Sequence, residues 1–122
     1  MPDIHLFSKC LHFLDYEELA STSARLGFDG LDLTVRPNGH VEPENFERDL
    51  PAAIEAIKKA GLSCEMMVTK ITGTQDKRNF DLLKLARSLG VKSYRLGGLK
   101  YEAGVPAMET VERYAAQLAE LA

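Results

Sequence analysis

Residues 27–37 read Gly27-Phe-Asp-Gly-Leu-Asp-Leu-Thr-Val-Arg-Pro37 and combine the end of a helix, a buried strand and the start of a polar loop. The first half of this pattern, an apolar or small residue, a glycine and a strand-like run, recurs around Gly61 and Gly90. A spacing of roughly 20 to 50 residues is typical of repeated structural units. Each repeat here predicts one strand plus one helix.

Further elements follow on both sides of this segment. Strands are expected at residues 4–8, 31–35, 64–68 and 93–96. Asp15, with Glu18 three residues later, is typical of a capping box and predicts the start of the first helix. Asp49 is the expected N-cap of the second helix, which would carry Pro51 in its first turn. Pro106 is expected to open the fourth helix, with an apolar stripe formed by Val111, Tyr114, Ala115, Leu118 and Leu121.

Strands that alternate with helices, without hairpin signals, predict a parallel sheet with right-handed crossovers. Two architectures compete, an open doubly wound sheet and a (β/α) barrel. A dinucleotide-binding sheet would need Gly-x-Gly-x-x-Gly after its first strand, whereas residues 8–12 read Ser-Lys-Cys-Leu-His. No Walker-type lysine loop is present either. The barrel is therefore favoured.

A complete barrel has eight units and about 250 residues, whereas this chain has 122 residues and four units. The fold class expected is α/β, with four successive βα units whose parallel sheet is half of a (β/α)8 TIM barrel. Residues 1–122 would be its N-terminal half, incomplete at the C-terminus. The alternative is a small, complete four-stranded α/β domain.

Composition excludes several function classes. The net charge of -3 and the lack of a basic stripe argue against a nucleic-acid partner. No apolar run approaches the roughly 18 residues of a membrane span, and the N-terminus lacks the pattern of a signal peptide, so a cytoplasmic location is expected. Cys10 and Cys64 have neither metal nor redox spacing and are expected to be buried free thiols.

Alternation along the strands predicts which side chains face the barrel interior and which face the helices. Leu31, Leu33 and Val35 would face helices. The inward set would be His5, Phe7, Lys9, Asp32, Thr34, Arg36, Glu65, Thr69, Ser93, Arg95 and Gly97. Its charged members must neutralise one another or bind a ligand. Asp32 and Glu65 are expected in an interior ion network, whereas Arg36 and Thr69, at the strand ends, are expected to contact ligand.

Histidines and metal ligands give weaker signals. His40 lies in the polar loop after Arg36 and is a candidate for substrate contact or proton transfer. His5 is expected in the core or the barrel floor, and His12 in an ordinary loop. No His, Asp or Glu pair has the spacing of a metal site, and no catalytic triad can be assembled.

Three segments carry a family likeness: residues 27–43 (GFDGLDLTVRPNGHVEP), 49–51 (DLP) and 94–98 (YRLGG). They resemble the sugar phosphate isomerase/epimerase family, whose members are xylose-isomerase-like TIM barrels related to endonuclease IV and inosose dehydratase. The likeness runs through essentially the whole chain and corresponds to the first half of such a barrel. Residues 34–41 are its most distinctive part.

The resemblance implies carbohydrate metabolism by a divalent-metal enzyme that uses Mn, Mg or Zn. Family members move protons between adjacent carbons through an enediolate, with two glutamates as acid and base. The family's Glu, Asp, His and Glu ligands come from strands five to eight, so no metal ligand or catalytic glutamate is assigned here, and Glu65 is not promoted to that role. This chain alone is expected to hold no metal and to be inactive. The substrate-binding residues implied are Arg36, His40, Thr69, Arg95 and Tyr101, with Lys9 as a weaker addition.

Two functions stay open. In the first, the parent protein is an isomerase or epimerase that acts on a small sugar or polyol. In the second, the chain is a non-catalytic carbohydrate- or polyol-binding module, or a half-barrel that pairs with another chain. Exposed half-barrel edges would favour self-association. A nuclease-like relative is disfavoured by the net acidity.

Overall fold

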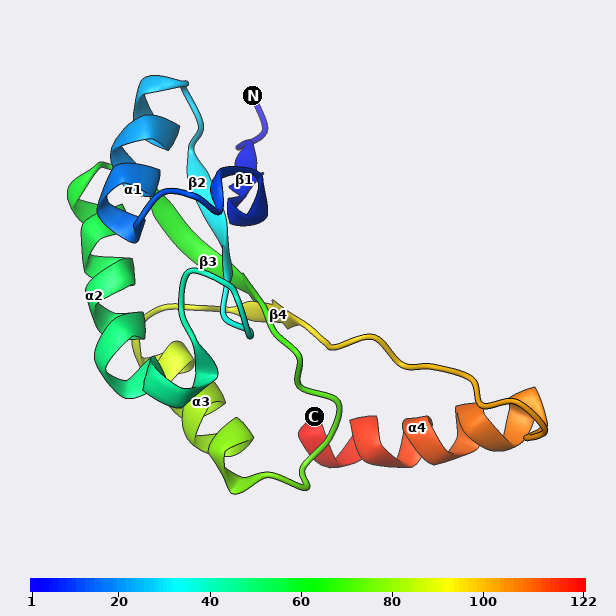
Figure 1. The fold of residues 1–122 in the computed structure, drawn as a ribbon. Helices are drawn as coiled ribbons and strands as arrows, with labels where there is room; N and C mark the ends of the chain where they lie inside the picture. The colour runs from blue at the N-terminus through cyan, green and yellow to red at the C-terminus, as the bar shows by residue number, and fades with distance from the viewer.

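The computed structural model describes residues 1–122, which form one parallel four-stranded sheet with helices against one of its faces (Figure 1). The strands are β1 (His5–Phe7), β2 (Gly30–Thr34), β3 (Ser63–Val68) and β4 (Ser93–Arg95). They lie in the order β1-β2-β3-β4, and every neighbouring pair is parallel. The predicted α/β class with four successive βα units is confirmed.

Four α-helices follow the four strands. They are α1 (Tyr16–Arg25), α2 (Phe46–Lys59), α3 (Lys77–Ser88) and α4 (Ala107–Leu121), and two short 3-10 helices, η1 (Ser8–Leu11) and η2 (Pro43–Asn45), lie in the loops after β1 and β2. Figure 1 shows α1, α2 and α3 side by side on the same side of the sheet. The opposite side of the sheet, called the open face below, carries no α-helix.

Local sequence signals account for most helix ends. The Asp15 carboxylate accepts a hydrogen bond from the Glu18 backbone N–H at 2.8 Å and caps α1 as predicted. Gly27, Gly61 and Gly90 follow α1, α2 and α3 with φ of 87°, 82° and 97°. These angles lie in the left-handed region that ends many helices and that glycine adopts without steric cost.

The predicted start of α2 is wrong. The helix begins at Phe46, not after Asp49, and Asn45 is its N-cap. The reason is the Phe46 ring, which is 2% exposed and belongs to the core, so burying it adds a helical turn before Asp49. Asp49 lies within this first turn and binds Arg48 at 2.8 Å, while Pro51 lies inside the helix.

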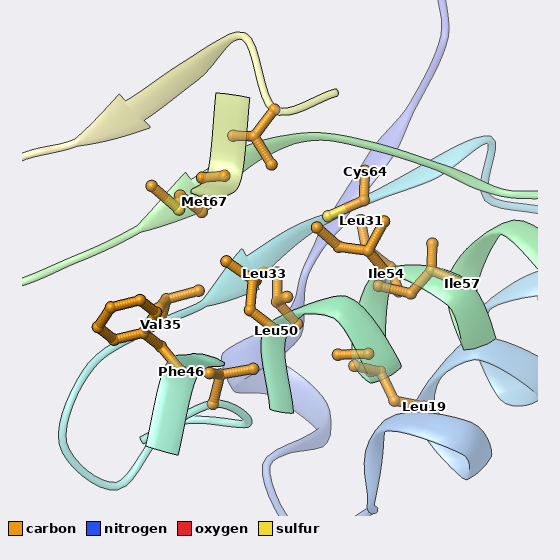
Figure 2. Packing of buried hydrophobic residues seen from close by; sticks show 14 of the residues in the cluster. Leu19, Leu31, Leu33, Val35, Phe46, Leu50, Ile54, Ile57, Cys64 and Met67 are labelled. Atoms are coloured by element: carbon orange, nitrogen blue, oxygen red, sulfur yellow. The ribbon is translucent and has the colours of Figure 1, made fainter. Parts of the chain in front are cut away.

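The core lies between the sheet and its helices (Figure 2). Leu31, Leu33 and Val35 alternate along and just beyond β2 and are at most 1% exposed. They are packed in one cluster with side chains of α1 and α2, namely Leu19, Leu50, Ile54 and Ile57. Removal of these groups from water is the main stabilising contribution of the fold. The predicted helix-facing set on β2 is confirmed.

The prediction that Glu65 and Thr69 face inward is wrong because β3 contains a bulge. Gly30 pairs with Ser63 but Asp32 pairs with Met66, so β3 has one extra residue in this interval. Met67 therefore lies opposite Leu33 in the core, and alternation puts Thr69 on the same side as Met67. Glu65 forms a surface ion pair with Lys92 at 2.8 Å and takes no part in an interior network.

The last unit packs least tightly. The segment after β4 runs away from the sheet, and α4 returns toward it only at its C-terminal end (Figure 1). Thr110 is the only buried residue of α4, and Val111, in the predicted apolar stripe, is 43% exposed. None of the four α-helices combines the length and apolar character that a membrane span requires.

The two cysteines differ in environment. The prediction that both are buried is wrong for Cys10, which lies exposed on η1. Cys64 is 4% exposed in the core, where burial raises the pKa of its thiol to about 12. The short η1 helix was not expected from the sequence, and it turns Cys10 outward.

Candidate functional site

Strand register places polar and aromatic side chains together on the open face. Phe7 pairs with Asp32, and Asp32 pairs with Met66. In the next row toward the carboxyl ends, Thr34 pairs with Val68 and Val68 with Arg95. Alternation puts the side chains of these two rows on the side of the sheet opposite the core.

Arg36 and Arg95, both predicted as substrate-binding residues, meet on one aromatic ring. Arg36 follows β2 and Arg95 ends β4, yet their guanidinium carbons lie 5.8 Å and 5.2 Å from the centroid of the Phe7 ring. At these distances a guanidinium is attracted by the electrons of the ring face. The ring therefore holds two positive charges together at the carboxyl ends of the strands.

Asp32 supplies the negative charge of this site. The residue is 8% exposed, and its Oδ2 lies 3.7 Å from Arg95 Nη2. The buried Oδ1 has no hydrogen-bond partner within the chain. Burial raises the pKa of Asp32, and the nearby charges of Arg95 and His5 partly oppose this rise. The open face thus has a carboxylate that is only partly compensated.

Lys9 and Arg36 line a second feature, a cavity of about 270 Å³ at the carboxyl ends of β1 and β2. This feature, the basic cavity, is lined by Lys9, His12, Thr34, Arg36, Pro37, Asn38 and Gly39. His12 was expected to be an ordinary loop residue, but the structure brings it to this cavity. The available signal was its spacing three residues after Lys9, because residues three apart lie on one side of a 3-10 helix.

His40 is positioned by hydrogen bonds within the chain. Its Nε2 lies 3.2 Å from the Leu11 carbonyl oxygen, and its Nδ1 lies 3.1 Å from both the Thr34 and the Ser8 hydroxyl oxygens. A carbonyl only accepts, so Nε2 carries the proton and Nδ1 accepts from a hydroxyl. Burial lowers the pKa of His40, which favours this neutral form. The ring holds the loop after β2 against η1.

Thr69 and Tyr101 lie apart from the basic cavity. Thr69 is 2% exposed, and its hydroxyl donates to the Arg95 carbonyl at 2.8 Å and accepts from the Ile71 N–H at 3.2 Å. It therefore joins the ends of β3 and β4. Tyr101 is 67% exposed and lines a different cavity, of about 260 Å³, against α4. Of the six predicted residues, Lys9 and Arg36 share the basic cavity, and Arg36 and Arg95 share the Phe7 ring.

The divalent ion implied by the resemblance has no matching set of residues in this chain. No three His, Cys, Asp or Glu side chains are grouped so that they could hold a metal ion. The arrangement can bind a small polar molecule, because guanidinium donors, one buried carboxylate and an aromatic ring lie on one face of the sheet. Compared with protein-family models and with curated proteins, the chain matches none.

Proposed function

We propose that this chain is the substrate-binding half of a (β/α)8 barrel that isomerises or epimerises a sugar or sugar phosphate. The strand order supports the barrel. In a doubly wound sheet the strand order reverses and helices cover both faces. Here the order is consecutive and α1, α2 and α3 share one side, as in successive units of a barrel (Figure 1).

The observation that carries the proposal is the meeting of Arg36 and Arg95 on the Phe7 ring. Closing the sheet into a barrel would turn this face into the interior, where barrel enzymes bind substrates at the carboxyl ends of the strands. Guanidinium groups donate and the Asp32 carboxylate accepts, so together they match the hydroxyl groups of a sugar. Phe7 supplies apolar surface for its carbon skeleton.

These residues bind and orient substrate in the proposal and carry no chemical step. A divalent metal, when bound by the remaining strands of the barrel, would polarise the substrate oxygens as the resemblance implies. The proposal also includes a cytoplasmic location, where Cys10 and Cys64 stay reduced.

Substrate binding by this half is testable on the chain itself. Titration of isotope-labelled protein with fructose, xylulose or inositol should shift NMR signals of Phe7 and of the Arg95 side chain. Arg95→Met should weaken these shifts, because it removes the donor but keeps an apolar side chain. Arg87→Gln on the exposed surface of α3 is the matched control. Shifts confined to α4, or none at high sugar concentration, would argue against the site.

The catalytic part needs the remaining half. If the proposal is correct, four further βα units that carry a Glu, Asp, His and Glu set exist, encoded after codon 122 or on another chain. The assembled barrel with manganese or magnesium should exchange solvent deuterium into a ketose at the carbon next to the carbonyl. A metal-loaded barrel that exchanges no deuterium into any ketose tested would remove the isomerase assignment.

A second candidate function is a half-barrel module that pairs with another copy of itself or with another chain. It is favoured by Met66, which is 40% exposed on the open face, and by the unpaired outer edges of β1 and β4. Light scattering should then show a concentration-dependent dimer that Met66→Lys shifts to monomer. Met108→Lys, on α4, is the control because Met108 is 66% exposed but lies on another element. A monomer at all concentrations would exclude self-pairing.

A further inference from the structure

The basic cavity lies where β1 and β2 end. Lys9 comes from η1, His12 follows η1 directly, and Arg36 follows β2, so two successive loops supply its charged side chains. Its volume of about 270 Å³ is near the lower end of the range for ligand pockets in proteins. A cavity of this size fits one small group, not a whole nucleotide.

Charge sets the chemistry of this cavity. Lys9, His12 and Arg36 all line it, and none of its lining residues is acidic. Neither Lys9 nor Arg36 takes part in an ion pair, although the chain has 18 acidic residues against 15 lysines and arginines. Glu42, the acidic residue of the same loop, accepts from the Asn38 N–H at 2.8 Å and does not line the cavity. The cavity therefore has an uncompensated positive charge in an acidic protein.

The cavity is held in shape before any ligand enters. The Arg36 guanidinium lies against the Phe7 ring, and the Arg36 carbonyl accepts from the Gly39 N–H at 2.8 Å. The His40 N–H donates to the Thr34 hydroxyl at 2.9 Å, which closes the loop onto β2. A Cβ at Gly39 would lie 2.9 Å from the Arg36 carbonyl oxygen and from Thr34 Cβ, so this close approach requires glycine. Binding then costs little ordering of the loop.

We propose that the basic cavity is an anion subsite that binds a phosphoryl group. Two permanent cations and an imidazole match a tetrahedral dianion better than a single carboxylate, since a phosphoryl group offers three acceptor oxygens and up to two negative charges. That this group belongs to the substrate rests on the proposed function; binding of the anion itself does not. The subsite is separate from the phosphate site that many barrels form after their last two strands.

The test uses the full chain with inorganic phosphate as the probe, and acetate as a comparison ligand that carries a single carboxylate. Phosphate should shift the backbone amide signals of Asn38 and Gly39 in a saturable way, and acetate should do so more weakly. Arg36→Gln should weaken phosphate binding by about tenfold, the loss of one charge-assisted contact, and Lys9→Gln by several-fold. Lys84→Gln, an exposed lysine of α3 without an ion pair, should leave binding unchanged. Circular dichroism confirms that each variant is folded.

Two outcomes would overturn the subsite. The first is the absence of saturable shifts at residues 36–39. The second is equal weakening by Lys84→Gln and Lys9→Gln, which marks a general charge effect. Two ligands separate this question from the proposed function: ribose 5-phosphate should bind more tightly than ribose, and Lys9→Gln, which does not touch the Phe7 site, should reduce that difference. If phosphate binds but ribose 5-phosphate binds no more tightly than phosphate, the result supports the subsite. It counts against the assignment of a sugar substrate.

Discussion

The carboxylate of Asp32 on β2 lies 3.7 Å from the guanidinium of Arg95 on β4, across the intervening strand β3. The two partners differ in their contact with water, since the Asp32 side chain is 11% exposed and that of Arg95 is 60% exposed. An ion pair with one solvated partner contributes little to stability. The cost of burying the Asp32 carboxylate is therefore larger than the attraction, which is why its pKa is raised.

Replacement of Asp32 by asparagine should stabilise the chain at neutral pH. Because burial raises the Asp32 pKa above its ordinary value of 3.8, the folded protein binds this proton more tightly than the unfolded chain does. The contribution of Asp32 to the free energy of unfolding is complete below pH 3.8. It falls as the pH rises through the raised pKa of the folded state, and it stays lower at pH 7. Asp32→Asn removes the destabilisation caused by ionising a buried carboxyl group. It should therefore raise the free energy of unfolding at pH 7 by about 1 kcal/mol or less.

Urea unfolding at pH 7 and at pH 4 measures this difference. The exposed Asp3 has no partner within the chain, so Asp3→Asn should change neither value. A destabilised Asp32→Asn variant at pH 7 would mean that the attraction to Arg95 exceeds the burial cost.

Replacement of His40 by alanine should destabilise the loop after β2 and flatten the dependence of stability on acid pH. The change removes contacts to Ser8, Thr34 and Leu11 and should cost about 1–3 kcal/mol. Burial lowers the His40 pKa below 6.5, so its contribution is complete above pH 6.5 and is lost as pH falls through the lowered folded value. His40→Ala should not show this decrease in stability at acid pH.

Thermal unfolding followed between pH 7.5 and pH 5, values chosen to bracket the ordinary histidine range of about 6.5, tests this expectation. His12→Gln is the control, because His12 is exposed and forms no hydrogen bond through its ring. If the melting temperature falls equally steeply with decreasing pH in His40→Ala and in the parent chain, His40 is not the group that titrates.

Replacement of Gly30 by alanine should disturb the pairing of β2 with β3. A Cβ on Gly30 would lie 2.7 Å from the Ser63 carbonyl oxygen and 2.9 Å from His5 Cε1, and closer still to the Ser63 hydroxyl. The backbone oxygen cannot move aside without separating the strands, so the free energy of unfolding should fall by about 2 kcal/mol or more. Gly98→Ala is the control, since its Cβ would meet no atom within 4 Å. Similar urea midpoints for the two variants would contradict the expectation.

The two thiols should differ in reactivity. At pH 8 a disulfide reagent should modify the exposed Cys10 quickly and leave Cys64 unmodified, because burial raises the Cys64 pKa to about 12 and blocks access. Two thiols should react once the chain is unfolded in urea. Cys10→Ser should remove the fast phase completely. Rapid reaction of both thiols in the native chain would mean that the core around Cys64 opens readily.

The sequence predicted the parallel sheet well because its signals are local. Glycines such as Gly27 act on their own φ, and the alternation of Leu31 and Leu33 requires only that one face of β2 be buried. The side-chain orientation along β3 was predicted wrongly because it depends on a non-local feature. Its bulge arises from pairing with β2, so Glu65 and Thr69 fit the simple alternation in the sequence but not in the structure.

The site was predicted in part for the same physical reason. Arg36 and Arg95 were expected near one another because the carboxyl ends of parallel strands share one edge of the sheet, and both lie over the Phe7 ring, while their role in substrate binding stays a prediction. The hydrogen bonds of His40 depend on Ser8, 32 residues away, and those of Thr69 on Arg95, 26 residues away. Such partners are set by tertiary distances, and no pattern within either loop indicates them.

The consecutive strand order gives this architecture a modular character. Within the sheet, β2 pairs with the strands β1 and β3, and β4 pairs with β3 alone. A further parallel strand could therefore pair with the outer edge of β4 while the existing strand pairings are kept. Addition of whole strand-and-helix units at one edge is thus compatible with the pairing already present in this sheet.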